Sequence, residues 1–256
     1  MVEPSVTNPT DANYKTNWSF MEFTYNHDQL YANISYVDFV GFPIGLSLTT
    51  STGAEKQVLG LSREGPARVA DGLVTQQQQD GRKWGDLIVR DDSGRILRIL
   101  SPNQGMVLNP SLFADYFESY VDDVWSYYRC HKLQIDTQCH FGIISGTVDD
   151  TGELLTVDGL EFRKPNTKDI FSASSGPFQT GADAKRNAII PRLNAELNRH
   201  EITNHYARLV HEANVDGRGY AHPYDDVAAS AGEDHSGFVN DGAPRRLTII
   251  VGGEVE

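Results

Sequence analysis

Cysteine, basic residues and long apolar runs are all scarce in this chain of 256 residues, and each shortage excludes a class of protein. With only two cysteines, Cys130 and Cys139, the chain is neither a disulfide-dense small domain nor a cysteine-rich metal protein. No apolar run approaches the ~20 residues that a membrane-spanning helix needs. The 35 acidic residues outnumber the 22 basic ones, and the net charge of −13 opposes binding to a phosphate backbone. We therefore expect a neutral or polar ligand, and neither nucleic acid nor a membrane as a partner.

What is present fits a folded protein. The hydrophobic share of 39% with 10% aromatic residues is typical of a globular chain with a real core, and the length suits one large domain or two small ones. The two cysteines either bridge to each other across a short loop or are both free thiols. Residues 1–5 lack the charged start and apolar stretch of a signal peptide, so none is expected there.

Short β-like stretches fill the first hundred residues or so. Aromatic and β-branched residues over 18–25 and 31–40 predict two strands that join around Asn26–Gln29. Further strands are expected at 44–50, 56–61, 86–90 and 95–100, and the run Gln76–Gln79 is expected in a loop. Short strands at this spacing favour a sandwich or barrel over a doubly wound sheet.

A mixed α/β segment follows. Asn109 and Pro110 predict the cap and first turn of an amphipathic helix that continues to Tyr128, with an aromatic stripe as its packing face. Strands are expected at 141–148 and 153–163, and a second helix at 184–200 that Pro191 kinks or restarts. A final buried strand is expected at 246–251.

Carboxylates are the best candidates for chemistry. Side chains alternate along a strand, so Glu22, Thr24 and Asn26 share one face, and this polar row suits sugar hydroxyls. Asp38 is an isolated acid among strand hydrophobes, which is costly unless it is hydrogen-bonded or functional. Hydrolysis of a glycosidic bond needs one acid to protonate the leaving oxygen and one carboxylate on the opposite side. The alternative is that each is an ordinary solvated or ion-paired strand acid.

The spacing of this pair is not fixed by the sequence. A plain hairpin would place Asp38 opposite residue 17, ~16 Å along the strand from Glu22 at ~3.3 Å per residue. An inverting glycosidase needs ~6.5–9.5 Å between its carboxyl groups and a retaining one ~5–5.5 Å. Either distance requires a shifted turn, a bulge or strong coiling.

A second acidic spot lies at Tyr220–Val227. Tyr224, Asp225 and Asp226 either line a sugar cleft or form a turn with Asx hydrogen bonds. The eight histidines are scattered; His131 with His140, and His200 with His205 and His211, lack convincing ligand spacing. His200 and His211 are expected on solvated faces, and no metal or cofactor is expected.

Together these segments resemble glycoside hydrolase family 64, the β-1,3-glucanases that release laminaripentaose. The resemblance covers nearly the whole chain. Its ordered segments are 18–26 (WSFMEFTYN), 31–40 (YANISYVDFV), 42–44 (FPI), 116–117 (YF), 170–172 (IFS), 176–178 (GPF), 197–199 (LNR), 222–226 (HPYDD) and 247–253 (LTIIVGG).

The resemblance implies a mainly β fold with an α/β part. A thaumatin-like β-sandwich or barrel domain at 1–108 and 204–256 would form a wide groove with a mixed α/β domain at 109–203. It also implies an inverting, extracellular, monomeric hydrolase of β-1,3-glucan, with Glu22 as general acid and Asp38 as general base at the family's spacing of sixteen residues. Thr24, Asn26 and Tyr31 would contact sugar, Tyr31 as a stacking platform.

One departure is that the family has a long β segment ahead of the catalytic glutamate, whereas 21 residues precede Glu22 here. We therefore expect several barrel strands to be absent. The alternatives to an enzyme are a non-catalytic thaumatin-like carbohydrate-binding or antifungal module, and a remnant whose groove is lost. The small number of cysteines and the α/β segment speak against the thaumatin-like module.

Overall fold

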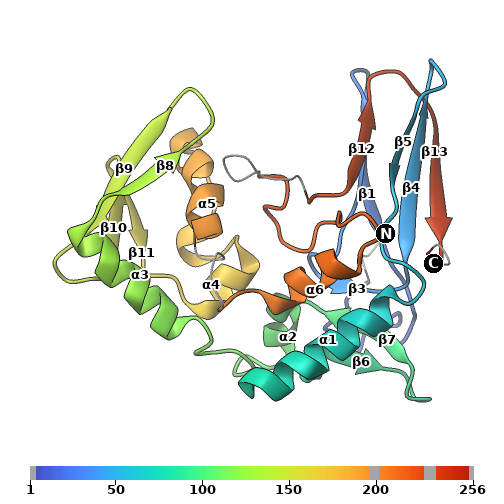
Figure 1. Ribbon diagram of the computed structural model, residues 1–256, viewed down its shortest axis with the longest axis horizontal. Coiled ribbons are helices and arrows are strands. Elements are labelled where there is room, and N and C mark those ends of the chain that lie inside the picture. Colours follow the sequence, from blue (N-terminus) through green and yellow to red (C-terminus); the bar gives the residue numbers. More distant parts are fainter. Residues whose placement is uncertain (1–3, 197–201, 228–234, 254–256) are drawn as a thin grey trace. The chain divides into compact units, whose positions relative to one another are not determined.

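The computed structural model describes residues 4–196, 202–227 and 235–253 (Figure 1). The chain divides into two compact units. The first contains the described residues up to Leu112 and those from His205 onward, and the second contains Phe113–Asn204. About as much of the chain is helical as is strand, and none of the described helices is both long and apolar enough to cross a membrane.

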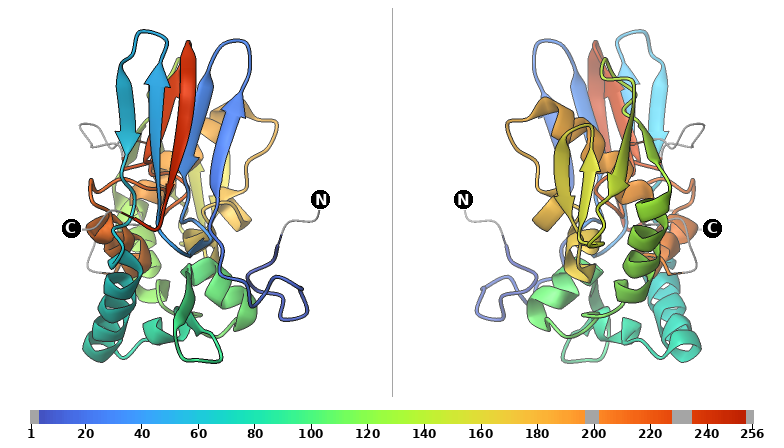
Figure 2. Two further views of the ribbon diagram at one scale, coloured as in Figure 1. Left: turned by 90° about the vertical axis from the view of Figure 1, so that its right-hand side faces the viewer. Right: turned by 90° about the vertical axis from the view of Figure 1, so that its left-hand side faces the viewer.

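Two three-stranded antiparallel sheets form the upper part of the first unit in Figure 2, above helix α1. One sheet has the order β1-β2-β12 and the other has the order β13-β4-β5. Leu46 and Leu48 of the second sheet and Ala32 and Ile34 of the first are fully buried, so the sheets share one core. The strands are β1 (Met21–Tyr25), β2 (Leu30–Ile34), β12 (Phe238–Asp241), β4 (Ile44–Thr50), β5 (Glu55–Val58) and β13 (Pro244–Val251).

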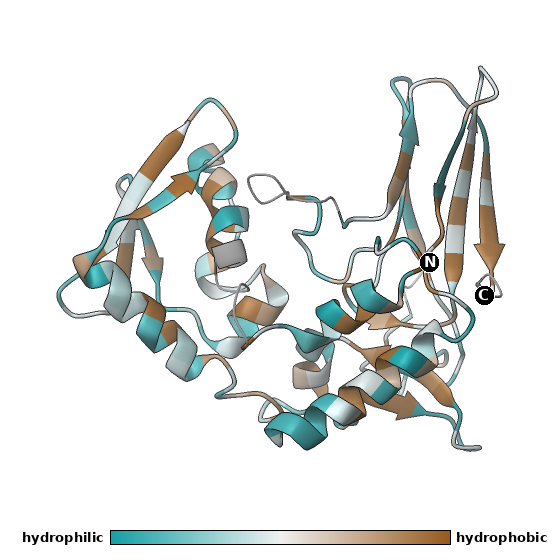
Figure 3. Ribbon diagram, in the orientation of Figure 1, coloured by the Kyte–Doolittle hydropathy of each residue, from teal (hydrophilic) through white to brown (hydrophobic). Residues whose placement is uncertain are grey.

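This sandwich is open along one side. Within the described residues the sheets do not close into a barrel, and β1 and β13 are both edge strands. An apolar pocket of about 280 Å³ is lined by residues of both, including Phe23, Tyr25 and Ile249, which are 64%, 70% and 49% exposed. In Figure 3, brown alternates with paler bands along β4 and β13. The strand expected at 246–251 is present as β13, but it is partly exposed, so our expectation that it is buried is wrong.

A third small sheet, β3-β7-β6, and three helices complete the first unit. Helices α1 and α6 pack side by side (Figure 1). Both were missed from the sequence, and the glutamine run expected in a loop lies in α1. The elements are β3 (Phe39–Val40), β6 (Ile88–Arg90), β7 (Ile96–Leu100), α1 (Gly65–Asp80), α2 (Pro102–Leu108), α6 (His205–Ala213) and a short 3₁₀ turn, η1 (Trp84–Leu87).

The second unit is a four-stranded antiparallel sheet of order β11-β10-β9-β8, with α3 packed against β9 and α5 against β8. One face of the sheet is buried, with Leu133, Val157 and Phe162 at 2% exposure or less, and the other face is exposed. The elements are β8 (Leu133–Asp136), β9 (Ile143–Val148), β10 (Leu154–Val157), β11 (Leu160–Arg163), α3 (Glu118–Cys130), α4 (Thr167–Ser172), α5 (Ala184–Glu196) and a 3₁₀ turn, η2 (Gly176–Phe178).

Two expectations for this part of the chain need correction, and a third is met over the residues described. Asn109 does not cap the long helix: it ends α2, turns follow, and α3 begins only at Glu118. The predicted strand over 153–163 is two strands, because Asp158 and Gly159 form a tight turn with φ of 46° and 83°. The second helix contains Pro191 as expected and is described to Glu196; its expected end, which includes His200, lies outside the described residues.

Cys130 and Cys139 are free, exposed thiols. This decides between the two alternatives left by the sequence. The fold of the second unit does not rest on a disulfide between them.

Candidate active site

The sheet β1-β2-β12 presents one polar and aromatic face. Met21, Phe23 and Tyr25 line the apolar pocket of the sandwich, so Glu22 and Thr24, which alternate with them, point to the opposite side. In the antiparallel register Glu22 lies opposite Asn33. Directly opposed residues share a face, so Asn33 joins this row. The alternation expected from the sequence is confirmed, and Glu22 is exposed.

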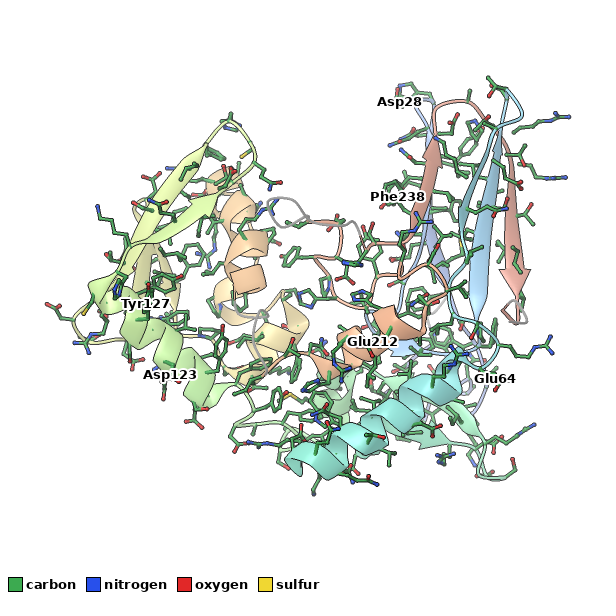
Figure 4. All side chains as sticks on the ribbon, in the orientation of Figure 1. Asp28, Glu64, Asp123, Tyr127, Glu212 and Phe238 are labelled. Atoms are coloured by element: carbon green, nitrogen blue, oxygen red, sulfur yellow. The ribbon has the colours of Figure 1, made fainter. Side chains whose placement is uncertain are left out.

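The aromatic part of this face comes from strands far apart in the sequence. Tyr31 lies opposite Thr24, and its ring stacks on Phe238 of β12 with centroids 5.0 Å apart and planes 18° apart. Its hydroxyl is 3.2 Å from that of Tyr220. Figure 4 labels Phe238 on the side of β12 turned away from β4 and β13. Phe238 and Tyr220 were missed because no local pattern links them to Tyr31.

Asn26 sits at the turn of the hairpin and has a structural task. Its Oδ1 accepts hydrogen bonds from the backbone N–H groups of Asp28, at 2.9 Å, and Gln29, at 3.0 Å. This arrangement explains why the chain turns where the sequence predicts. The acceptor of the Asn26 side chain is therefore engaged, whereas its Nδ2 has no partner within the described residues.

Asp38 does not continue the hairpin formed by β1 and β2. The register of these strands is the plain one, but the chain bends after Ser35 and brings Phe39 against Trp18 and Phe20, with ring centroids 4.6 and 5.6 Å apart. Asp38 therefore lines a pocket with Trp18 and Phe20, and the straight hairpin expected from the sequence does not describe its position.

Asp38 is half-buried and lines a pocket of about 280 Å³ together with Trp18, Phe20 and Gln104. Residues 4–7 form another part of the wall. Its Oδ1 accepts a hydrogen bond from Gln104 Nε2 at 2.6 Å. A carboxylate that is held by one oxygen and faces a pocket has the form expected of a group that activates water.

The loop that follows Tyr220 lies beside the end of β2. The backbone N–H of Tyr220 donates to the Ile34 carbonyl at 3.1 Å. Within the loop, Asp225 Oδ2 accepts the backbone N–H groups of Ala221 and His222, both at 2.8 Å. The loop is thus a turn held by an aspartate side chain, but the carboxylate accepts from residues before it, so it is not the Asx turn that one of the two alternatives expected. It leaves Tyr224 and Asp226 as side chains of a structured loop.

Electrostatics at this loop reflect its burial. Burial raises the pKa of Tyr224, with a smaller contribution from Asp226, and raises that of Tyr220, helped by its hydrogen bond to Tyr31. Burial lowers the pKa of His222. These tyrosines are therefore neutral hydroxyls at any ordinary pH, suited to hydrogen bonds with sugar.

The histidines do not gather into a ligand set. Among the residues described, no group of three or more His, Cys, Asp and Glu side chains could hold a metal ion. His211 is not on a solvated face as expected, because its Nε2 lies 2.9 Å from Asp225 Oδ2 and its side chain is 21% exposed. His205 packs edge-on against Trp84.

The sequence is similar to proteins of one family. The sequence model of glycoside hydrolase family 64, described as beta-1,3-glucanase, matches residues 1–203 and 200–251. Two proteins named glucan endo-1,3-beta-glucosidase, from Cellulosimicrobium cellulans and Arthrobacter sp. (strain YCWD3), are 27% and 28% identical over 97% of this chain. The alignment covers 48% of each relative, so the chain spans about half their length.

Solved structures agree with the sequence match. A laminaripentaose-producing beta-1,3-glucanase in complex with laminaritetraose superposes with a TM-score of 0.84 and 26% identity, over 97% of this chain and 72% of that one. A beta-1,3-glucanase domain from Clostridium beijerinckii has the same fold, with a TM-score of 0.76 and 24% identity over 98% and 68% of the two chains. The family model covers nearly the whole chain, and this protein therefore belongs to glycoside hydrolase family 64.

Proposed function

We propose that the protein is an inverting endo-β-1,3-glucanase that cuts laminarin- or curdlan-type glucan into short oligosaccharides such as laminaripentaose. The observation that carries this is the pair of carboxylates on the first unit: Glu22 is exposed on one face of the sheet, and Asp38 lines a pocket with Trp18 and Phe20, which shortly precede Glu22 in the chain. An inverting glycosidase holds its two carboxyl groups ~6.5–9.5 Å apart, which leaves room for a water molecule. Family membership and the names of the relatives support the same substrate.

In the proposed reaction Glu22 is the general acid and Asp38 the general base. Glu22 gives its proton to the glycosidic oxygen as the bond from that oxygen to the anomeric carbon breaks. Asp38 takes a proton from water as the water oxygen bonds to the same carbon from the opposite face. The product sugar has inverted configuration, and proton exchange with solvent resets both carboxyl groups. This chemistry needs two carboxyl groups and water, and no cofactor.

Sugar binding is assigned to the face around the acids. Thr24 offers a hydroxyl next to Glu22 on its strand, and Asn26 can donate from Nδ2. Tyr31 contributes an aromatic ring, stacked on Phe238, on which a partly apolar sugar face can pack.

The loop after Tyr220 supplies the remaining contacts. Tyr224 contributes a neutral hydroxyl, Asp226 contributes an exposed carboxylate, and Asp225 contributes Oδ1, since its Oδ2 is taken up within the loop. Neutral and anionic acceptors suit the hydroxyl-rich glucan.

The setting follows from the substrate. A polymeric glucan does not enter a cell, so we propose that the protein acts outside it, as a monomer. We further propose that the first unit corresponds to a thaumatin-like domain and the second to the mixed α/β domain of the family.

The experiment is a pair of isosteric substitutions. Glu22→Gln removes the proton donor and should lower kcat ~10²-fold or more, because a positioned acid contributes at least that much. Asp38→Asn should abolish turnover with glucan binding nearly unchanged. Glu161→Gln, another exposed strand glutamate, and Asp123→Asn, an exposed aspartate on α3 labelled in Figure 4, are matched controls that should keep full activity.

Full activity in Glu22→Gln would overturn the assignment of the acid. Loss of binding together with turnover in Asp38→Asn would point to a structural role for Asp38. Proton NMR of the freshly formed reducing end separates the mechanisms: inversion of a β linkage gives the α anomer first, and retention gives the β anomer.

A further inference from the structure

The backbone of Asp38 is fixed by the end of a strand pair. Phe39 and Val40 of β3 pair with Leu100 and Ile99 of β7. The ladder extends one step further, because the backbone N–H of Ser101 donates to the carbonyl of Asp38 at 2.8 Å. Asp38 therefore sits where β3 begins and where β7 passes into helix α2.

Ser101 and Gln104, at the start of α2, make only half of the usual capping box. Ser101 caps the helix, with its hydroxyl accepting the backbone N–H of Gln104 at 3.4 Å. In a capping box the side chain at Gln104's position would accept the N–H of the cap residue in return. Here the backbone N–H of Ser101 donates to the carbonyl of Asp38 instead. The side chain of Gln104 is therefore not needed at the cap and can also turn toward Asp38.

Gln104 uses that freedom to hold the carboxylate. Its Nε2 donates to Asp38 Oδ1 at 2.6 Å, and both residues line the same pocket. Oδ2 of Asp38 receives no hydrogen bond from any residue that the structure describes. One oxygen is thus fixed and the other is left for a water molecule or a sugar hydroxyl.

Tyr206 of α6 is a titratable group near this carboxylate. It is buried, and its pKa is raised mainly by burial and further by the charge of Asp38. Its hydroxyl donates to the Tyr36 carbonyl at 2.6 Å, so it is not directed at Asp38. Among the residues that the structure describes, Gln104 is therefore the side-chain donor that orients Asp38.

We propose that Gln104 is a positioning residue for the reaction: it holds the carboxylate of Asp38 by Oδ1 and turns Oδ2 toward the attacking water. This inference rests on the proposed role of Asp38 as general base. A loss of alignment at a reacting group costs much in kcat and little in substrate affinity.

The test compares Gln104→Leu and Gln104→Glu with the full wild-type chain on linear β-1,3-glucan. Gln104→Leu removes the donor at similar size and should lower kcat roughly 10–100-fold, with KM changed less than about threefold. Gln104→Glu keeps the shape but sets a carboxylate against Asp38, so it should be less active than Gln104→Leu near neutral pH. Asn103→Ala, one position earlier in the same helical turn, is the control.

The outcomes separate this proposal from the proposed function. If wild type is active and Asp38→Asn is not, then wild-type kcat in folded Gln104→Leu, or a loss that falls on KM and not on kcat, would overturn the role of Gln104. Equal activity of Gln104→Glu and Gln104→Leu would do the same, because a merely structural role does not distinguish donor from acceptor. If Asp38→Asn is as active as wild type, the proposed base itself is wrong. Thermal melting of each variant shows whether it is folded.

Discussion

One oxygen of the Asp225 carboxylate makes several contacts in the loop that carries Tyr224 and Asp226, and removing it should loosen both the loop and the first unit. Asp225 Oδ2 accepts the N–H groups of Ala221 and His222 and lies 2.9 Å from His211 Nε2. Asp225 is 11% exposed at its side chain, so water replaces these bonds only in part. Hydrogen bonds to a charged group are worth about 1.5–3 kcal/mol each. Because water replaces part of these hydrogen bonds, we expect Asp225→Ala to lower the free energy of unfolding by less than their sum, about 2–3 kcal/mol.

Differential scanning calorimetry measures this directly. For a chain of this size each kcal/mol corresponds to about 2–4 °C, so Tm should fall by about 4–12 °C. Asp225→Asn keeps a neutral acceptor for the two N–H groups, so its Tm should lie between those of wild type and Asp225→Ala. Asp123→Ala, an exposed aspartate on α3, should leave Tm close to that of wild type. If the Tm of Asp225→Ala equals that of wild type, the loop does not depend on this carboxylate and the reasoning fails.

Two further predictions concern α6. Burial and the nearby Arg208 lower the pKa of His205, whose Nδ1 accepts the Arg208 Nε–H at 3.2 Å. The unfolded chain therefore takes up this proton first, and stability should be lost as the pH falls below about 6.5. His205→Asn, which keeps an acceptor, should flatten the dependence of Tm on pH between about 7.5 and 5.5; an unchanged slope would contradict the assignment. Tyr206→Phe leaves the buried Tyr36 carbonyl without its donor and should cost about 1–3 kcal/mol, seen as a lower urea midpoint at unchanged slope. A midpoint equal to wild type would show that the bond contributes nothing.

The parts of the fold that the sequence predicts are those with local causes. The β1–β2 hairpin follows from aromatic and β-branched residues on either side of the turn, and Asn26 closes that turn with its own side chain. Strand alternation then places Glu22 and Thr24 on one face. These features need no knowledge of the rest of the chain.

Helix α1 was missed because its pattern is weak alone, whereas α6 is amphipathic but has only nine residues. Helix α1 is mostly polar, and its buried residues include Gln76, whose side chain bonds to Asp80 of its own helix and to Arg208 of α6. The glutamine run therefore gains its order from a helix far away in the sequence. Propensity and periodicity do not report such a contact.

The site shows the same limit. The position of Asp38 depends on the bend after Ser35 and on the packing of Phe39 against Trp18, which are tertiary features. Gln104 is 66 residues from Asp38, and its proposed role is visible only because Ser101 gives its N–H to Asp38 and not to Gln104. Helix α2 and its cap at Ser101 were not predicted, because the cap was expected at Asn109.

The most direct measurement for the whole account is chromatography of the products from linear β-1,3-glucan, with wild type beside Glu22→Gln. We expect a discrete short oligosaccharide, a pentamer above all, from wild type and none at the same enzyme concentration from the variant. No product from either protein, with both folded by circular dichroism, would contradict the account and favour a glucan-binding module without catalysis.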